Sequence, residues 1–191
     1  MIEDLYKKRY QVYRYTDKIP DETMVKNIIN KTYELTASKQ GLVPYRVYIL
    51  GPNCKEEKRK IFNKVCATTD NGTHNHNIKA PYNLIFTIRL VDNPNQHVKN
   101  LIKKGNVYVC TESKLYKKEK HNVSLEIGMF AKVLTGLCME NNLGVSYQLC
   151  FYNWVHENEE VLFSMQFGYP ATKRLENGDF KPNINEVIKW I

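Results

Sequence analysis

The sequence lacks the usual marks of a disulfide-bonded or metal-binding protein. Its five cysteines are an odd number, none forms a C-x-x-C pair, and no histidine stands at zinc-finger spacing from any of them. His74 and His76 stand close together, but two loop histidines without a carboxylate or thiol beside them make a weak metal site. We therefore expect reduced thiols, a reducing compartment and no metal.

Long apolar runs are also missing. Apolar stretches such as residues 161–165 are much shorter than a membrane span. The first nine residues are charged and contain no apolar segment of the kind found in secretion signals. We therefore expect a cytoplasmic protein without a membrane partner.

Negative charge is scarcer than positive charge, with 20 Asp and Glu against 28 Lys and Arg, a net charge of +8. A basic excess attracts polyanions, so one alternative is a nucleic-acid-binding module whose aromatic side chains stack on bases. The same excess suits an enzyme whose ligands carry phosphates. The positive charges are dispersed over residues 7–9, 55–60 and 114–120, and no recognised nucleic-acid motif is present, so we expect no nucleic-acid partner.

Enough apolar sequence is present for one folded domain. The 191 residues are 42% hydrophobic, and no repeat or low-complexity linker divides them, so we expect a single domain over residues 1–191. Apolar spacing predicts helices that begin near Glu3 and after Pro20, and further helices over residues 55–66, 124–142 and 184–191. Strands are predicted within residues 42–50, 82–90, 145–152 and 161–167. Helices mixed with non-adjacent strands predict an α+β or three-layer arrangement.

The helix predicted over residues 124–142 has the longest signal. It is apolar around most of its girth, which is typical of a helix at the centre of a core or at a subunit interface. Gly144 follows its end and is predicted to supply the left-handed cap. In contrast, residues 91–120 are polar and lysine-rich, and they predict a surface excursion with a short strand or helix.

Two segments could bind a ligand. In residues 8–15, Arg9 and Arg14 could each address a phosphate through a bidentate fork, although a solvated helix end is the ordinary alternative. In residues 36–45, small and hydroxylated residues before Gly41 and Pro44 predict a rigid turn with free N–H groups. Such a turn could hydrogen-bond the edge of a flat heteroaromatic ring, and a plain helix-to-strand connection is the alternative.

Six short motifs occur in an order that resembles the nitroreductase family of flavoproteins. They are an arginine-rich opening that ends in an aromatic residue, an Asp-x-x-Pro turn, a small-residue loop before a strand, Ala-Pro before the next strand, Asn-Leu-Gly after the long helix, and Gly-Tyr-Pro. They fall at residues 9–15, 17–20, 37–45, 80–81, 142–144 and 168–170, so the resemblance covers nearly the whole chain.

The resemblance implies a three-layer α/β/α sandwich with a mostly antiparallel central sheet, assembled as a homodimer. It implies FMN at the dimer interface, lined by both subunits, with residues 91–120 as a variable region over the substrate pocket. The implied activity is that of an oxidoreductase that passes a hydride from NAD(P)H through FMN to a small electron-poor acceptor such as a nitroaromatic or a quinone. This scheme requires no catalytic side chain.

The resemblance also implies which residues bind FMN. Arg9 would hold the phosphate, with Tyr10 and Gln11 in the same corner and Tyr13 where the family has a second cation. Ser38, Lys39 and Gly41 would lie along the pyrimidine and ribityl side, where the charge of Lys39 would favour flavin reduction. The remaining candidates are His76, or less securely Thr73, in the loop before Ala80, and Lys181 and Asn183 in a basic pair near the C-terminus.

Several of these positions depart from the family pattern. Gln11 replaces a serine, Gly41 an asparagine and Asn183 an arginine, and Tyr13 is not a cation. The phosphate subsite therefore has fewer cations than is usual, although Arg14 could compensate for Tyr13. This leaves a second alternative open, namely a flavin-binding relative without reductase turnover.

Overall fold

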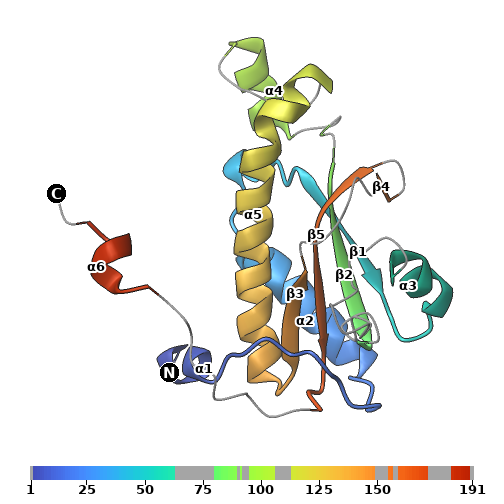
Figure 1. Cartoon of the computed structure of the whole chain (residues 1–191). Coiled ribbons are helices and arrows are strands. Elements are labelled where there is room, and N and C mark those ends of the chain that lie inside the picture. Colours follow the sequence, from blue (N-terminus) through green and yellow to red (C-terminus); the bar gives the residue numbers. More distant parts are fainter. Residues whose placement is uncertain are drawn as a thin grey trace.

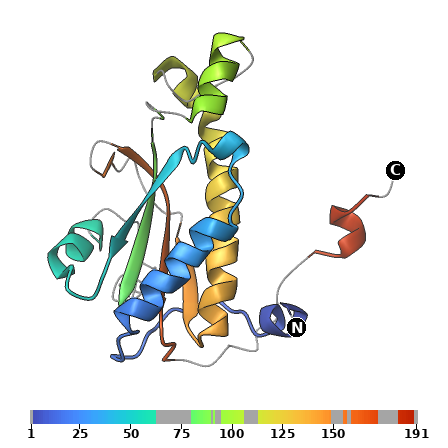
Figure 2. The same ribbon diagram turned by 180° about the vertical axis from the view of Figure 1, so that it is seen from behind.

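The computed structural model describes residues 2–62, 80–89, 91, 95–105, 113–148, 155–156, 159–171 and 182–189. Its longest element is helix α5 (Ser113–Glu140), which packs against a β-sheet beside helix α2 (Glu22–Leu35). Figure 1 shows α5 running along the sheet, and Figure 2 shows α2 crossing beside it from behind. These two helices and the sheet enclose the main core.

The sheet is antiparallel, in the order β1–β2–β5–β3. Its strands are β1 (Tyr45–Leu50), β2 (Tyr82–Ile88), β5 (Glu159–Gly168) and β3 (Gly144–Gln148), and the short β4 (Val155–His156) pairs with the start of β5. All four predicted strands are present, although residues 149–152 of the third predicted strand lie outside the described part. The expected α+β class with an antiparallel sheet is confirmed.

The remaining helices are short. They are α1 (Ile2–Lys7), α3 (Lys55–Phe62), α4 (Gln96–Lys103) and α6 (Ile184–Val187). Helix α2 begins where the sequence predicted, because the side chain of Asp21 accepts a hydrogen bond from the backbone N–H of Met24 at 2.9 Å. Figure 1 shows α6 standing apart from the sheet, beyond α1.

The prediction of a surface excursion over residues 91–120 is wrong from residue 113 onward, and residues 106–112 lie outside the described part. Helix α5 begins at Ser113, eleven residues before the predicted start at Ser124. Lysine, leucine and glutamate are good helix formers, so this stretch extends the helix although its apolar spacing is weak. The short helix expected in the first half is α4, whose Val98 is buried beside Leu42 and Val91.

The core forms where α5 crosses the sheet. Phe130 of α5 meets Phe86 of β2 edge to face, with ring centroids 5.6 Å apart, and it meets Tyr45 of β1 at 5.9 Å. Burying side chains of this size stabilises the fold by roughly 1.5–3 kcal/mol each. On another side of the helix, Leu125 and Met129 are 57% and 45% exposed, so α5 also presents an apolar surface to solvent.

Helix α5 contains one segment, Lys120–Glu140, that is long and apolar enough to cross a membrane by length and composition alone. The sequence predicted a helix over residues 124–142, which overlaps this segment, and no membrane span. Half of it is buried against the rest of the chain, and the core helix of a soluble protein meets the same criterion.

The end of α5 differs from the prediction. The left-handed residue is Asn142, with φ of 58°, and not Gly144. Leu143 N–H donates to Cys138 O and Asn142 N–H to Met139 O, which together form a Schellman motif. Gly144 serves close packing instead, because a Cβ there would lie 2.5 Å from Cγ2 of Val12.

Candidate functional site

The segment after α1 is laid along β3. Helix α1 is tied to α5 because the hydroxyl of Tyr6 donates to the carbonyl of Lys132 at 3.1 Å, and the ammonium of Lys132 lies 3.7 Å from the centroid of the Tyr6 ring. Val12 N–H then donates to Val145 O at 3.1 Å. The chain between these two anchors, which includes Arg9, is therefore fixed against the end of α5 and the start of β3.

Arg9 and Gln11 both contact Tyr147 of β3. The guanidinium carbon of Arg9 lies 4.8 Å from the centroid of the Tyr147 ring. The amide of Gln11 donates to Tyr147 O at 3.0 Å and accepts from Tyr147 N–H at 3.4 Å. The hydroxyl of Tyr147 is hydrogen-bonded to that of Thr135 on α5. We call Arg9, Gln11, Thr135 and Tyr147 the Arg9 corner.

The other two candidates in this segment differ in exposure. Tyr10 is half-buried, and burial raises the pKa of its phenol above the ordinary value, so it stays neutral and can donate a hydrogen bond. Tyr13 is 58% exposed. Arg14, the expected substitute for a second cation, is also exposed, and its carbonyl accepts from Ala171 N–H at 3.0 Å.

Ser38, Lys39 and Gly41 lie together in a tight turn over residues 38–43, which we call the 38–43 turn. Gly41 N–H donates to Ser38 O, Leu42 N–H to Lys39 O, and Val43 N–H to the hydroxyl of Ser38 at 2.8 Å. Gly41 has φ of 67°, a conformation that glycine adopts without strain. The turn is rigid, as predicted, but the expectation of free N–H groups is wrong at these three positions, because the turn satisfies them internally.

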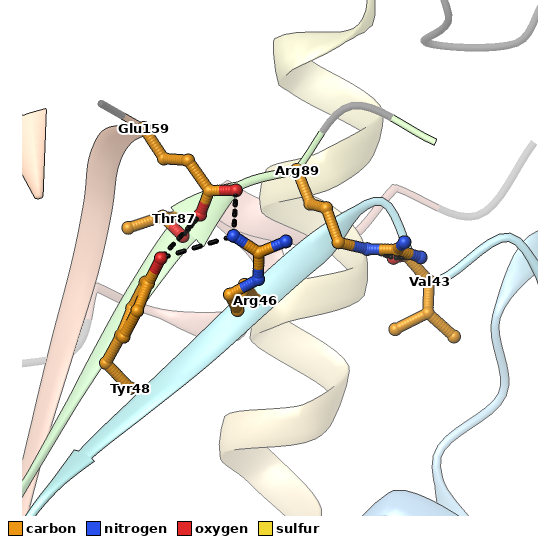
Figure 3. Close-up of polar contacts among 6 residues, drawn as sticks. All are labelled: Val43, Arg46, Tyr48, Thr87, Arg89 and Glu159. Carbon is orange, nitrogen blue, oxygen red and sulfur yellow. Dashed lines mark hydrogen bonds and ion pairs between the residues drawn. The ribbon is translucent and has the colours of Figure 1, made fainter. Parts of the chain in front are cut away.

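Two charged side chains hold the 38–43 turn from outside. The carboxylate of Glu126, on α5, accepts from Lys39 N–H at 3.1 Å, and Glu126 is only 6% exposed. The guanidinium of Arg89 donates to Val43 O at 2.9 Å and to Leu42 O at 3.0 Å. Figure 3 shows Arg89 reaching the backbone of Val43. The side chain of Lys39 itself is exposed.

Val43 is strained within this turn. Its φ of 44° is rare for a β-branched residue, and such conformations persist only where the surroundings enforce them. The hydroxyl of Ser38 and the guanidinium of Arg89 supply this constraint through the N–H and the carbonyl of Val43. Strain of this kind is concentrated at ligand-binding sites.

The Arg9 corner and the 38–43 turn lie on opposite sides of α5. Their anchors on this helix, Glu126 and Thr135, are nine residues apart (135 − 126), which is two and a half turns and about 14 Å along the axis. Two and a half turns place the two side chains on opposite sides of the helix. A single chain therefore does not bring the two groups of candidates together.

The other predicted residues are not gathered at either group. His76, Thr73 and Lys181 lie outside the described residues. Asn183 is exposed and caps α6, where its side chain accepts from Asn185 N–H at 2.9 Å. Among the described residues, no group of His, Cys, Asp and Glu could hold a metal ion.

A polar cluster that the sequence did not predict lies at the end of the sheet that adjoins the 38–43 turn. Glu159 accepts hydrogen bonds from Arg46 at 2.5 Å, from Thr87 at 2.6 Å and from Tyr48 at 3.3 Å (Figure 3). Its signal in the sequence is weak, because these residues come from three strands whose order only the fold reveals. Nearby, an open cleft of about 710 Å³ runs between α2 and β1, with Arg46 and Arg89 in its lining.

No protein-family model matches the sequence, and a search of curated proteins finds no match. Solved structures do match in fold. A nitroreductase family protein from Streptococcus pneumoniae superposes with a TM-score of 0.67 at 17% identity, over 100% of both chains. A candidate NAD(P)H:FMN oxidoreductase from Staphylococcus epidermidis gives 0.73 at 12% identity, over 100% of this chain and 96% of that one.

A third similar structure, a candidate nitroreductase from Exiguobacterium sibiricum in complex with FMN, gives a TM-score of 0.70 at 10% identity, over 100% of this chain and 97% of that one. At such identities the likeness defines the fold. The chain has the nitroreductase-like fold, as the order of its motifs predicted.

Proposed function

We propose that this protein is an FMN-dependent oxidoreductase of the nitroreductase type, working as a homodimer. The observation that carries the proposal is the Arg9 corner, where a cation is held over an aromatic ring within a fold shared with a structure solved in complex with FMN. We assign the predicted residues to the two ends of the ligand, with Arg9 at the phosphate and the 38–43 turn at the isoalloxazine edge.

The chemistry of the Arg9 corner fits a phosphate. The guanidinium of Arg9 carries five N–H donors in a planar fork. Those donors match the oxygens of a phosphate and can form a bidentate pair. The neutral phenol of Tyr10 and the exposed side chain of Arg14, both in the same segment, could add further donors.

The 38–43 turn fits the edge of a flat ring. Its backbone is satisfied and braced by Glu126 and Arg89, so it offers a fixed surface on which the side chain of Lys39 stands exposed. Reduced flavin carries extra negative charge at its pyrimidine end, so a lysine placed there favours the reduced form. Gly41 keeps the turn in this shape, because its φ is 67° and a Cβ there would lie 3.2 Å from the side-chain amide nitrogen of Asn95.

A second copy of the chain would unite the two groups. The Arg9 corner and the 38–43 turn lie on opposite sides of α5, so a pocket that uses both needs the corner of one copy and the turn of another. The exposed apolar residues Leu125 and Met129 lie on α5 beside Gly128, where a Cβ would meet nothing within 4 Å. Pairing across this surface would bury them, and the helices of each copy would then complete a three-layer sandwich.

Bound FMN would accept a hydride from NAD(P)H and pass it to an electron-poor acceptor such as a nitroaromatic or a quinone. The chain would contribute position and charge. Arg9 would hold the phosphate, the 38–43 turn would support one edge of the ring, and Lys39 would balance charge at the pyrimidine end. We assign the variable region over the substrate pocket to residues 91–112, which include α4.

An absorbance spectrum tests the cofactor. We expect the purified protein to show flavin bands or to gain them on incubation with FMN, with uptake of one FMN per chain. A colourless protein that takes up no FMN contradicts the proposal. If that protein also shifts labelled DNA in a salt-dependent manner, the nucleic-acid-binding alternative replaces it.

Steady-state kinetics test turnover. The FMN-loaded protein should oxidise NADH or NADPH in the presence of a quinone or a nitroaromatic. A protein that binds FMN but oxidises neither nicotinamide is a flavin-binding relative without reductase activity.

Sedimentation tests the dimer. The 22.4 kDa chain should sediment at about twice this mass, and replacing Met129 by glutamate should shift it toward the monomer with loss of FMN uptake. Lys31→Glu, on an exposed position of α2, is the matched control and should leave the dimer intact. A wild-type monomer that binds FMN contradicts the shared pocket.

A further inference from the structure

We propose that Tyr147 is a positioning residue that holds the side chain of Arg9 in place. We infer that this contact makes the site selective for a flavin that carries a phosphate. The inference rests on the proposed function and assigns the selectivity to a residue outside the predicted binding set. Its basis is the contact of 4.8 Å between the guanidinium of Arg9 and the ring of Tyr147.

The ring of Tyr147 is fixed from several directions. Its hydroxyl is hydrogen-bonded to Thr135, whose own hydroxyl donates to Ala131 O at 2.7 Å within α5. Its backbone N–H and carbonyl are both bonded to the side chain of Gln11. Phe163 of β5 packs against the ring, with centroids 5.6 Å apart. The position of the Tyr147 ring is therefore fixed by its surroundings, and the ring determines where the side chain of Arg9 lies.

This arrangement prepares Arg9 for an anion. An arginine side chain loses considerable rotamer freedom when it binds, and a side chain that is already ordered loses less. The attraction between the cation and the ring face holds the guanidinium in one place without occupying its N–H donors. Gln11, two residues after Arg9 in the sequence, contributes to the same arrangement, because its side chain bonds the backbone of Tyr147.

Ordering of Arg9 affects only the phosphate end of the ligand, so it should discriminate between flavins with and without a phosphate. Riboflavin has the same ring system and ribityl chain as FMN but no phosphate. Loss of the contact between Arg9 and the ring of Tyr147 should therefore weaken the binding of FMN and leave the binding of riboflavin nearly unchanged. General damage to the fold would weaken both ligands alike, so the ratio of the two dissociation constants separates positioning from structure.

The experiment measures the dissociation constants of FMN and riboflavin by quenching of flavin fluorescence, using the full-length wild type and its variants. The wild type should prefer FMN by at least about tenfold. Tyr147→Leu should remove most of this preference, as should Arg9→Gln, and the double variant should lose little more because both changes remove one interaction. Tyr147→Phe, which keeps the ring, should retain most of the preference.

Two further variants keep the result interpretable. Tyr82→Leu removes another packed aromatic ring, stacked on Phe167 in the core away from Arg9, and should leave the FMN-to-riboflavin ratio unchanged. Tyr147→Met, whose flexible side chain can fill irregular gaps in a core, replaces Tyr147→Leu if the latter does not fold.

Each remaining outcome overturns the inference. If the Tyr147 variants lower both affinities equally, or retain the preference that Arg9→Gln abolishes, Tyr147 is only a packing residue while the proposed function stands. If the wild type binds FMN and riboflavin equally well, or binds neither, the assignment of Arg9 to the phosphate in the proposed function fails together with the inference.

Discussion

The Arg9 corner and the 38–43 turn are both rigid, but different interactions hold them. The corner is built from an aromatic ring, an amide and a hydroxyl, contributed by the N-terminal segment, α5 and β3. The turn closes on itself through its own backbone, and charged side chains brace it at Lys39, Leu42 and Val43. The corner therefore depends on how distant segments pack, whereas the turn depends on two buried or half-buried charges.

The largest effect should come from disturbing the packing on which the corner depends. In Gly144→Ala, the new Cβ would lie 2.5 Å from Cγ2 of Val12 and 3.2 Å from Pro170. Val12 is buried and its N–H donates to Val145 O, so relief requires the N-terminal segment to shift. We expect a loss of about 3 kcal/mol in the free energy of unfolding, measured by urea denaturation.

The matched control for this change is Gly51→Ala. A Cβ at Gly51 would meet only the ring of Tyr82, at an ordinary 3.7 Å, so we expect a change below about 1 kcal/mol. Equal losses in the two variants would show that the contact between Gly144 and Val12 has no special role.

The turn should respond to the loss of its buried carboxylate. Glu126→Ala leaves the N–H of Lys39 without its partner and opens a gap in the core, so we expect a loss of about 2 kcal/mol. Glu126→Gln keeps an oxygen that can accept the same hydrogen bond and should lose less than half as much. Thermal unfolding of both variants measures the difference, and equal losses would mean that the charge itself holds the turn.

Gly144 and Glu126 belong to parts of the structure that the sequence predicted only in part. The strands and the later part of α5 were predictable, because apolar spacing reflects burial on one face. The start of α5 and the cap at Asn142 were not, because weakly periodic lysine-rich sequence and an asparagine in a left-handed conformation carry little local signal. The motif order identified the candidate segments, but the partners Tyr147 and Glu126 are far from them in sequence and become neighbours only through the fold.

A third prediction compares two cations that bind backbone carbonyls. Arg89 binds those of Leu42 and Val43, and Lys58 binds those of Ala80 and Pro81 at 2.8 and 2.7 Å. Burial lowers the pKa of Lys58 from 10.5 to about 8, whereas a guanidinium stays charged at any ordinary pH.

The sign follows from proton binding. Between about pH 8 and pH 10.5 the unfolded chain keeps the proton on Lys58 and the folded chain releases it, so the free energy of unfolding should rise with pH in this window. We expect a rise of about 1 to 2 kcal/mol that is absent in Lys58→Met. A profile that is the same in the wild type and the variant would mean that Lys58 keeps an ordinary pKa.

The smallest effect concerns the connection between α5 and β3, close to the corner. Asn142 has φ of 58°, which glycine adopts more easily, so Asn142→Gly should stabilise the protein by about 0.5 to 1 kcal/mol. Urea denaturation should show a higher midpoint, and a lower midpoint would contradict the assignment of the cap to this residue.

Mixed dimers test the central claim, that one copy's Arg9 corner and another copy's 38–43 turn form a shared FMN site. Chains with Arg9→Gln and chains with Gly41→Val are co-expressed with different tags, and dimers that contain one of each are isolated. Each variant alone should bind FMN weakly, whereas the mixed dimer should regain wild-type affinity at one of its two sites. Mixed dimers in which both sites remain weak would contradict a pocket shared between two copies.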